Sequence, residues 1–354
     1  MKILHSADWH LDAPFAGRPQ AAWLRRELLK IPGKVAAVCR EENCDMMVLS
    51  GDLFDGPYTR ESLDALITAL KEVRVPVFIS PGNHDHLRPG APWEAVQWPE
   101  NVHIFKNTVP EAVLVEGLDA CVWGAGFDSV EAPGLLRNFR ACGEAKWQIG
   151  VFHGDPTQVN SPYNPITAGQ IRASGLDYLA LGHIHKGGRI DAEKTICAWP
   201  GCPMGRGFDE LGEKGVLVVT LDDTKSVKFV PLDTVRFHDL EVAAGRDVAQ
   251  SLAAVLPGAG SDDLYRITFV GESAGIDLEE LTRRFSQFPN LELRDRTVPP
   301  VDIWSAVGSD SLEGVYFGML KSQLENADEE TAARLLLAAQ ISRKILDGQE
   351  VTLP

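Results

Sequence analysis

The sequence predicts an α/β domain, a smaller α+β unit and a helical tail. Three observations lead to this prediction. Short apolar runs alternate with amphipathic segments over the first 230 residues, a pattern typical of a sheet covered by helices. A second alternation of strands and helices begins near residue 235. The 354 residues, 44% of them hydrophobic, exceed one ordinary core, so we expect domains at 1–232, 235–300 and 310–347.

The expected strands of the first domain are short, rich in Val, Ile, Leu or Phe, and end at Gly, Pro or Asp. They are Lys2–His5, Met46–Ser50, Val75–Ser80, Gln148–Phe152 and Tyr178–Leu181. Between them, Ala21–Glu41 and Arg60–Val73 have the apolar spacing of helices. The segment 102–125 is hairpin-like, so we expect a mixed sheet.

The remaining elements follow from the same patterns. Lys214–Leu221 and Ser226–Leu232 flank a polar turn and predict a hairpin that closes the first domain. The α+β unit is expected to contain three strands and two helices, namely Arg236–Val242, Asp247–Val255, Asp263–Val270, Leu278–Phe285 and Leu291–Arg294. The tail, 311–347, is predicted to be helical with a break at 326–328. Its apolar stripe fits either packing on its own domain or docking of a partner protein.

Composition excludes several classes of protein. We find no apolar run long enough to span a bilayer and no signal-peptide core, so we expect a cytoplasmic protein that does not contact a membrane. Six cysteines without a CxxC pair suit a reducing compartment. The net charge of −16 argues against a broad phosphate-binding surface. Bound divalent metals would nevertheless supply local positive charge.

Five short motifs follow the expected strands, where ligands bind in open α/β sheets. They are Asp8-Trp9-His10, Gly51-Asp52, Gly82-Asn83-His84-Asp85, His153-Gly154 and Gly182-His183-Ile184-His185. A spacing of two in extended backbone points two side chains to the same side. Each motif alone also fits a turn, a helix cap or a core histidine. Seven of the nine histidines lie in or beside these motifs, and that concentration favours a metal site.

The candidate ligands comprise two Asp, one Asn and four His, without Cys, which favours Mn²⁺, Fe²⁺, Co²⁺ or Zn²⁺. They are Asp8, His10, Asp52, Asn83, His153, His183 and His185. This set is too large for one ion, and a carboxylate such as Asp52 can bridge two. Two ions roughly 3.5–4 Å apart clamp both oxygens of a phosphoryl displacement and activate a bridging water. We therefore expect a two-metal phosphoesterase with a metal-bridging hydroxide as nucleophile.

Taken in order, the motifs resemble those of the calcineurin-like metallophosphoesterase superfamily. HSADWHLD at 5–12, GDLFD at 51–55, and PGCP to FDE at 200–210 are similar to the SbcD-type repair nucleases and the YhaO-like bacterial proteins. The resemblance implies a two-sheet β-sandwich flanked by helices, a small α+β capping domain and C-terminal helices.

The resemblance also implies roles for individual residues. One ion would be held by Asp8, His10, Asp52 and His185, and the other by Asp52, Asn83, His153 and His183. His84 would act as an acid or stabilise the phosphate, with Asp85 orienting it. Manganese would be the preferred ion. Arg206, which lies between two glycines, is either a contact for a substrate phosphate or a plain surface arginine.

These implications predict a DNA exonuclease or endonuclease that acts in repair. In the branch that the chain resembles, the nuclease forms a homodimer and works with a coiled-coil ABC ATPase of the SbcC type, for which the C-terminal helices would be the dock. The alternative is a small-molecule phosphodiesterase or phosphatase on the same dinuclear site, which the acidic charge favours. A metal-bound scaffold that regulates an ATPase is a third hypothesis, but such a scaffold would not need the His84-Asp85 pair.

Overall fold

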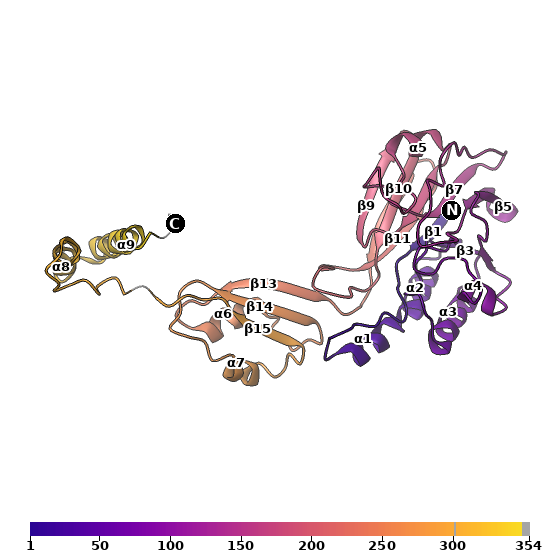
Figure 1. Cartoon of the computed structure of the whole chain (residues 1–354). Coiled ribbons are helices and arrows are strands. Elements are labelled where there is room, and N and C mark those ends of the chain that lie inside the picture. Colours follow the sequence, from indigo (N-terminus) through magenta and orange to yellow (C-terminus); the bar gives the residue numbers. More distant parts are fainter. Residues whose placement is uncertain (301, 349–354) are drawn as a thin grey trace. The chain divides into compact units, whose positions relative to one another are not determined.

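The computed structural model describes residues 1–300 and 302–348, and the chain divides into two compact units. Figure 1 shows the chain with many of its elements labelled. The first unit comprises Met1–Asp239 with Asp262–Tyr265, and the second comprises Leu240–Ser261 and the residues from Arg266 onward. The capping and tail segments, which we expected as separate domains, fall in one unit. None of the described helices is both long and apolar enough to cross a bilayer.

The first unit contains two six-stranded mixed sheets. The first sheet has the strand order β12-β11-β1-β2-β3-β4. Its strands are β1 (Lys2–Ser6), β2 (Met46–Leu49), β3 (Val77–Ile79), β4 (Val102–Ile104), β11 (Gly215–Thr220) and β12 (Ser226–Pro231). The strands β1 to β4 are parallel, so their carboxyl ends meet at one edge. The predicted hairpin is confirmed, because β11 pairs antiparallel with both β12 and β1.

The second sheet has the strand order β5-β6-β7-β8-β10-β9. Its strands are β5 (Glu111–Val115), β6 (Ala120–Gly124), β7 (Trp147–His153), β8 (Tyr178–Gly182), β9 (Lys186–Ala192) and β10 (Thr195–Gly201). The strands β6, β7, β8 and β10 are parallel. The hairpin expected within 102–125 is the antiparallel pair β5–β6, whereas β4 joins the first sheet.

Both faces of the central strands are buried, because each sheet is covered on both sides. In β1, Ile3 faces the core between the sheets and Leu4 faces the core beneath the helices. In β7, Val151 lies in the shared core, whereas Phe152 packs in a third core on the outer face of the second sheet. Successive strand side chains point to opposite faces, which explains the nearly continuous apolar runs in the sequence. The predicted two-sheet sandwich flanked by helices is confirmed.

Of the two helical segments predicted in the first unit, one is wrong in part. The segment 21–41 is two helices, α1 (Ala21–Leu28) and α2 (Ile31–Glu41), and Pro32 lies in the first turn of α2, where no helical N–H is required. The helix α3 (Arg60–Val73) has the predicted bounds, and Thr59 begins it with a capping box. Three short helices complete the unit: α4 (Pro92–Ala95), the 3-10 helix η1 (Glu116–Leu118) and α5 (Ala168–Ala173).

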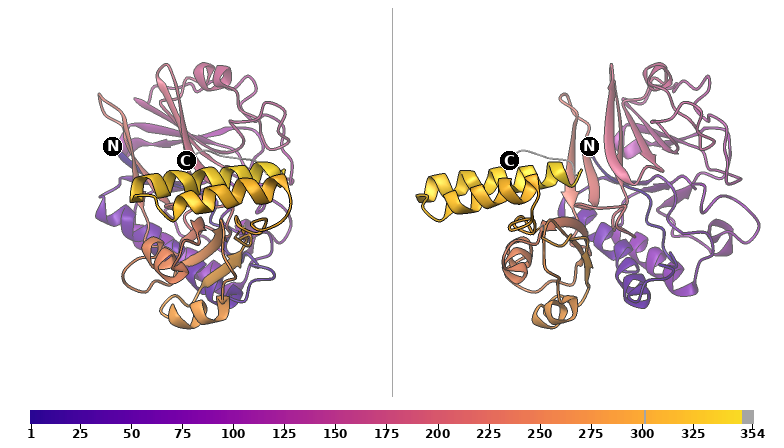
Figure 2. Two further views of the ribbon diagram at one scale, coloured as in Figure 1. Left: turned by 90° about the vertical axis from the view of Figure 1, so that its left-hand side faces the viewer. Right: turned by 60° about the vertical axis from the view of Figure 1, so that its left-hand side comes forward.

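The α+β elements after residue 235 are confirmed to within one residue at each end. They are β13 (Phe237–Ala243), α6 (Val248–Val255), β14 (Leu264–Val270), α7 (Leu278–Arg284) and β15 (Leu291–Asp295), and the strands form one sheet. The first residues of β13 and β14 are counted with the first unit. The tail is helical with the predicted break. Its helices α8 (Leu312–Leu324) and α9 (Glu329–Leu346) lie side by side in both views of Figure 2.

Candidate metal centre

All five motifs lie at the carboxyl ends of parallel strands. Asp8 and His10 follow β1, Asp52 follows β2, and Asn83 follows β3 in the first sheet, while the last three predicted ligands come from the second sheet. These three are His153 at the end of β7 and His183 and His185 after β8. The edges of the two sheets meet here, so residues from five strands converge on one site.

Four of the seven predicted ligands have a left-handed backbone conformation, which non-glycine residues rarely adopt. They are Asp8 (φ 55°), His10 (φ 47°), Asp52 (φ 52°) and His183 (φ 94°). Hydrogen bonds maintain these turns: the amides of Asp8 and His10 donate to the carbonyls of Gly51 and Asp52, at 3.0 and 2.9 Å. Such conformations cost roughly 1–3 kcal/mol each and tend to occur at functional sites.

Gly51 and Gly82 allow the loops to approach one another. Gly51 has a φ of +86°, and a Cβ there would lie 2.6 Å from Nδ1 of His153 and 2.9 Å from the backbone of Gly82. A Cβ on Gly82 would overlap the carboxylate of Asp52. Glycine at both positions therefore leaves the room that the Asp52 and His153 side chains occupy.

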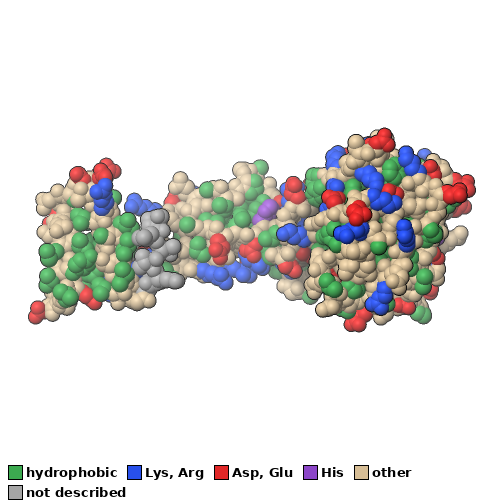
Figure 3. Space-filling view, turned by 90° about the horizontal axis from the view of Figure 1, so that it is seen from above, with side chains coloured by type: hydrophobic (Ala, Val, Ile, Leu, Met, Phe, Trp, Pro, Cys, Tyr) green, Lys and Arg blue, Asp and Glu red, His purple; other side chains and the backbone are tan. Residues whose placement is uncertain are grey.

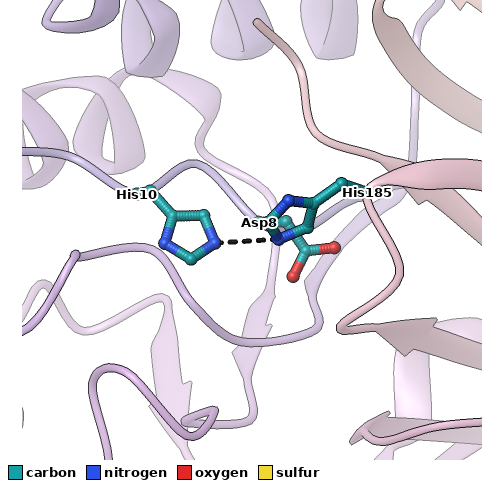
Figure 4. A group of neighbouring side chains, drawn as sticks. All are labelled: Asp8, His10 and His185. Atoms are coloured by element: carbon teal, nitrogen blue, oxygen red, sulfur yellow. Dashed lines mark hydrogen bonds between the residues drawn. The ribbon is translucent and has the colours of Figure 1, made fainter. Parts of the chain in front are cut away.

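Three predicted ligands of the first ion form one group, which we call the His10–His185 cluster. The ligating atoms of Asp8, His10 and His185 all lie within 4.8 Å of one another. In Figure 4, the two rings meet through their Nε2 atoms, 3.1 Å apart, beside the Asp8 carboxylate. Nitrogen and oxygen atoms this close together could hold one metal ion.

Three predicted ligands of the second ion form the His153–His183 cluster, centred on Asn83. The side-chain oxygen of Asn83 lies 2.9 Å from Nε2 of His153 and 3.3 Å from Nδ1 of His183. His153 is fully buried and Asn83 is 7% exposed. Burial opposes protonation of His153, but the carboxylate of Asp52 raises its pKa to about 9. The site therefore attracts positive charge, which fits bound divalent ions.

Asp52 lies between the two clusters. Its Oδ2 is 3.3 Å from Nε2 of His153 and 3.8 Å from Nε2 of His10. Its Oδ1 accepts a hydrogen bond from the amide of His84 at 2.9 Å, which fixes the carboxylate. Burial favours the neutral acid, yet the neighbouring His153 holds the pKa of Asp52 well below its usual range. The Asp52 carboxyl group is thus ionised, and its Oδ2 faces one histidine of each cluster.

Three of the four histidines bond an oxygen atom through the ring nitrogen that faces away from the site. The pairs are His10 with Asp55 (2.8 Å), His185 with Glu210 (2.6 Å) and His153 with the carbonyl of Ser50 (2.8 Å). Such outer partners fix the tautomer and leave Nε2 available to a metal. Neither Asp55 nor Glu210 was predicted as a site residue, although both belong to segments that resemble the SbcD branch.

The partner of His84 differs from the predicted one. Nδ1 of His84 lies 3.1 Å from Asp55, whereas the Asp85 carboxylate accepts hydrogen bonds from the amides of Leu53 and Gly82, each at 2.7 Å. Burial raises the pKa of Asp85 to about 7. Asp85 therefore ties the second and third motif loops together, and Asp55 orients His84. His84 and Asp85 have different partners because adjacent side chains in this turn point in different directions.

Arg206 lies beside the His10–His185 cluster rather than on the open surface. Its side chain is 23% exposed, and its Nη atoms lie 3.1 Å from Glu210 and 3.5 Å from Asp55. Burial opposes the charge, but Glu210 and Asp55 raise the pKa of Arg206. The interpretation as a plain surface arginine is wrong. A contact with a substrate phosphate stays a prediction.

A two-sheet sandwich with Asp, Asn and His ligands at its strand ends is the arrangement of a metal-dependent phosphoesterase. Residues 1–187 match the family model of the calcineurin-like phosphoesterases, and the chain belongs to this family. Its first 187 residues include every predicted ligand.

Two relatives support the SbcD/YhaO-like branch. The metallophosphoesterase YhaO of Bacillus subtilis is 34% identical over 239 residues, which cover 62% of this chain and 57% of YhaO. The SbcD component of the nuclease SbcCD from the same organism is 26% identical over 323 residues, covering 79% of this chain and 78% of the relative. Among solved structures, a dimetal phosphatase from Danio rerio matches 66% of this chain and 96% of its own, with 12% identity and a TM-score of 0.44.

Proposed function

We propose that this phosphoesterase is a DNA nuclease that uses two divalent ions, with Mn²⁺ preferred. The observation that supports a two-ion reaction best is Oδ2 of Asp52, which lies 3.8 Å from Nε2 of His10 and 3.3 Å from Nε2 of His153. A pair of bound ions would supply an activated water and stabilise charge on the attacking and leaving oxygens. Oxygen and imidazole donors without thiolates suit Mn²⁺.

His84 is the residue that we assign to the leaving oxygen. Its side chain is 45% exposed, and the contact of Nδ1 with Asp55 leaves Nε2 available to a substrate. The hydrogen bond with Asp55 raises the pKa of His84, so the ring keeps its proton to a higher pH than a free histidine does. A cationic imidazole at this position would protonate the leaving oxygen or stabilise the phosphate.

A basic segment beside the site supports a polyanionic substrate. Residues 18–34 contain five Lys or Arg and one Glu, although the whole chain carries a net charge of −16. Arg25 and Arg26 line a cavity of about 250 Å³ together with Leu11 and Asp12, the residues that follow His10. Both arginines donate to backbone carbonyls, and within residues 1–300 and 302–348 neither pairs with a carboxylate. Their charges are available to phosphates.

The proposal is tested by a panel of metals and substrates. We expect the protein to degrade DNA with Mn²⁺ faster than it hydrolyses a cyclic nucleotide or a phosphomonoester. His84→Ala should abolish this activity and leave Mn²⁺ binding intact. No cleavage of single- or double-stranded DNA, with metal content confirmed, would refute a nuclease. Faster turnover of the small substrates would select the alternative, a small-molecule phosphodiesterase or phosphatase, which the acidic charge favours.

The basic segment has its own test. DNA binding by Arg25→Gln/Arg26→Gln should show a slope of log K against log salt that is smaller by about 2, because each phosphate contact contributes about 0.9. The matched control is Arg283→Gln/Arg334→Gln, which removes two exposed arginines elsewhere and should leave the slope unchanged. Equal slopes for both double variants would exclude α1 as the DNA-binding segment.

We further propose that the helices α8 and α9 dock a coiled-coil ATPase of the SbcC type. Several of their large apolar side chains are exposed, among them Leu312 (87%), Met319 (61%) and Ile345 (61%). Figure 3 shows hydrophobic side chains gathered on this helix pair. An apolar surface of this kind usually marks an interaction site. The relative SbcD is named as a subunit, which agrees with a partner.

Co-expression with an SbcC-type ATPase tests the docking surface. Leu312→Asp/Met319→Asp should lose co-purification, whereas Val109→Asp, an exposed apolar residue of the first unit (71%), should retain it. If the double variant still co-purifies, the helices are not the dock. If the wild-type chain instead sediments as a dimer that only the double variant dissociates, the surface serves the homodimer. A cytoplasmic location, which the six free cysteines suit, belongs to the same proposal.

A further inference from the structure

Arg206 contacts the outer partner of each histidine in the His10–His185 cluster. Among the described residues, it contacts no outer partner of a histidine in the His153–His183 cluster. Its Nη1 lies 3.5 Å from Oδ1 of Asp55, and its Nη2 lies 3.1 Å from Oε1 of Glu210. The same two oxygens bond Nδ1 of His10 at 2.8 Å and Nδ1 of His185 at 2.6 Å. One guanidinium therefore shares the two carboxylates that stand behind the His10–His185 cluster.

A carboxylate on the outer nitrogen of a histidine strengthens the ring as a metal ligand, because its negative charge raises the basicity of the inner nitrogen. An arginine paired with that carboxylate withdraws part of this charge. Nη2 of Arg206 also lies 3.0 Å from Nδ1 of His185, and both groups are hydrogen-bond donors when Nδ1 carries the proton shared with Glu210. The guanidinium therefore opposes positive charge at this cluster.

The His153–His183 cluster has a different environment. The outer nitrogen of His153 bonds the backbone carbonyl of Ser50 at 2.8 Å, and the neutral Asn83 lies on the inner side. In the part of the chain that the structure describes, no Lys or Arg forms an ion pair with Asp52 or a hydrogen bond with the side chains of Asn83, His153 or His183. Burial does not distinguish the clusters, because His10 and His153 are both fully buried and His183 and His185 are both partly exposed. The two metal positions therefore differ in the charge that lies behind their histidines.

We infer that Arg206 weakens metal binding at the His10–His185 cluster, so that the ion there is the exchangeable one of the pair. This inference rests on the proposed function, because it requires that both clusters hold ions. It makes Arg206 a positioning residue that acts through Asp55 and Glu210, and it distinguishes two sites that each have two histidine ligands.

The test is a titration of metal-free protein with Mn²⁺, followed by calorimetry and by electron paramagnetic resonance of free Mn²⁺. Wild-type protein should bind two ions with distinct affinities, and His185→Ala should remove the weaker event only. Arg206→Met, which keeps an unbranched apolar stem but removes the guanidinium and its charge, should tighten the weaker event about tenfold, at the low end of outer-partner effects. The tighter event should change less than about threefold.

Two further variants serve as controls. Arg206→Lys keeps the charge, so its weaker event should stay within about threefold of wild type. Glu210→Gln removes an outer carboxylate and should weaken the same event by about 10–100-fold. Weaker or unchanged binding in a folded Arg206→Met variant overturns the inference, as does loss of the tighter event in His185→Ala. Wild-type protein that binds no Mn²⁺ would refute the proposed function itself, which is a separate result.

Discussion

His5 provides a stability prediction that does not require bound metal. This residue of β1 is fully buried, and its ring bonds the hydroxyl of Tyr178 through Nδ1 at 2.7 Å and the carbonyl of Leu181 through Nε2 at 3.1 Å. A neutral ring satisfies both contacts, with the tyrosine hydroxyl donating to Nδ1 and Nε2 donating to the carbonyl. Burial lowers the pKa of His5 to about 3, although the bond to Leu181 acts in the opposite direction.

The size of the effect follows from the two pKa values. The unfolded chain protonates His5 near pH 6.5, whereas the folded chain does so only near pH 3, so acid favours the unfolded state. The stability that depends on neutral His5 is complete above pH 6.5 and is lost progressively as the pH falls towards 3. Because pH 5 lies about 1.5 units below the pKa of the unfolded chain, the free energy of unfolding falls by about 2 kcal/mol at this pH.

The assay is urea unfolding of wild-type protein and of His5→Gln at pH 7 and pH 5, both in EDTA. Glutamine retains one donor and one acceptor, so it can replace both contacts without titrating. Other groups titrate in both proteins and cancel in the comparison. Wild-type protein should lose about 2 kcal/mol more than the variant between the two pH values. Equal losses would refute the assignment of a buried, neutral His5.

Three further predictions concern the site. Asp52→Asn should lower DNA hydrolysis by about a thousandfold and reduce the Mn²⁺ stoichiometry, because the amide offers no anionic oxygen to two ions. If calorimetry shows an unchanged stoichiometry, Asp52 does not bridge two ions. Gly51→Ala should lower the unfolding free energy by about 2 kcal/mol or more, because its Cβ would lie 2.6 Å from Nδ1 of His153 at a φ of +86°; a melting temperature equal to that of wild type would contradict this. Treatment with EDTA should abolish hydrolysis, and added Mn²⁺ should restore the activity more fully than added Mg²⁺ does. Equal restoration by Mg²⁺ would argue against the imidazole-rich donor set as the catalytic site.

The sequence alone was sufficient for features that depend on neighbouring residues. The bounds of α3 follow from its apolar spacing and the Thr59 cap, and the elements after residue 235 follow from similar local patterns. The set of candidate ligands could also be predicted, because each motif follows a strand and residue type determines which metals a side chain can bind. The break near Leu29 was missed, because apolar spacing continues across it.

Tertiary structure alone decided which residues hold these ligands in place. The pairing of His84 with Asp55 rather than with its neighbour Asp85 depends on how two loops meet, and sequence adjacency pointed to the wrong partner. Glu210 and Arg206 reach His185 and Asp55 from a loop after the last strand of the second sheet. Local sequence determines where each strand ends and which side chain follows it. Only the packing of the two sheets determines the direction in which those side chains point and which charges lie behind them.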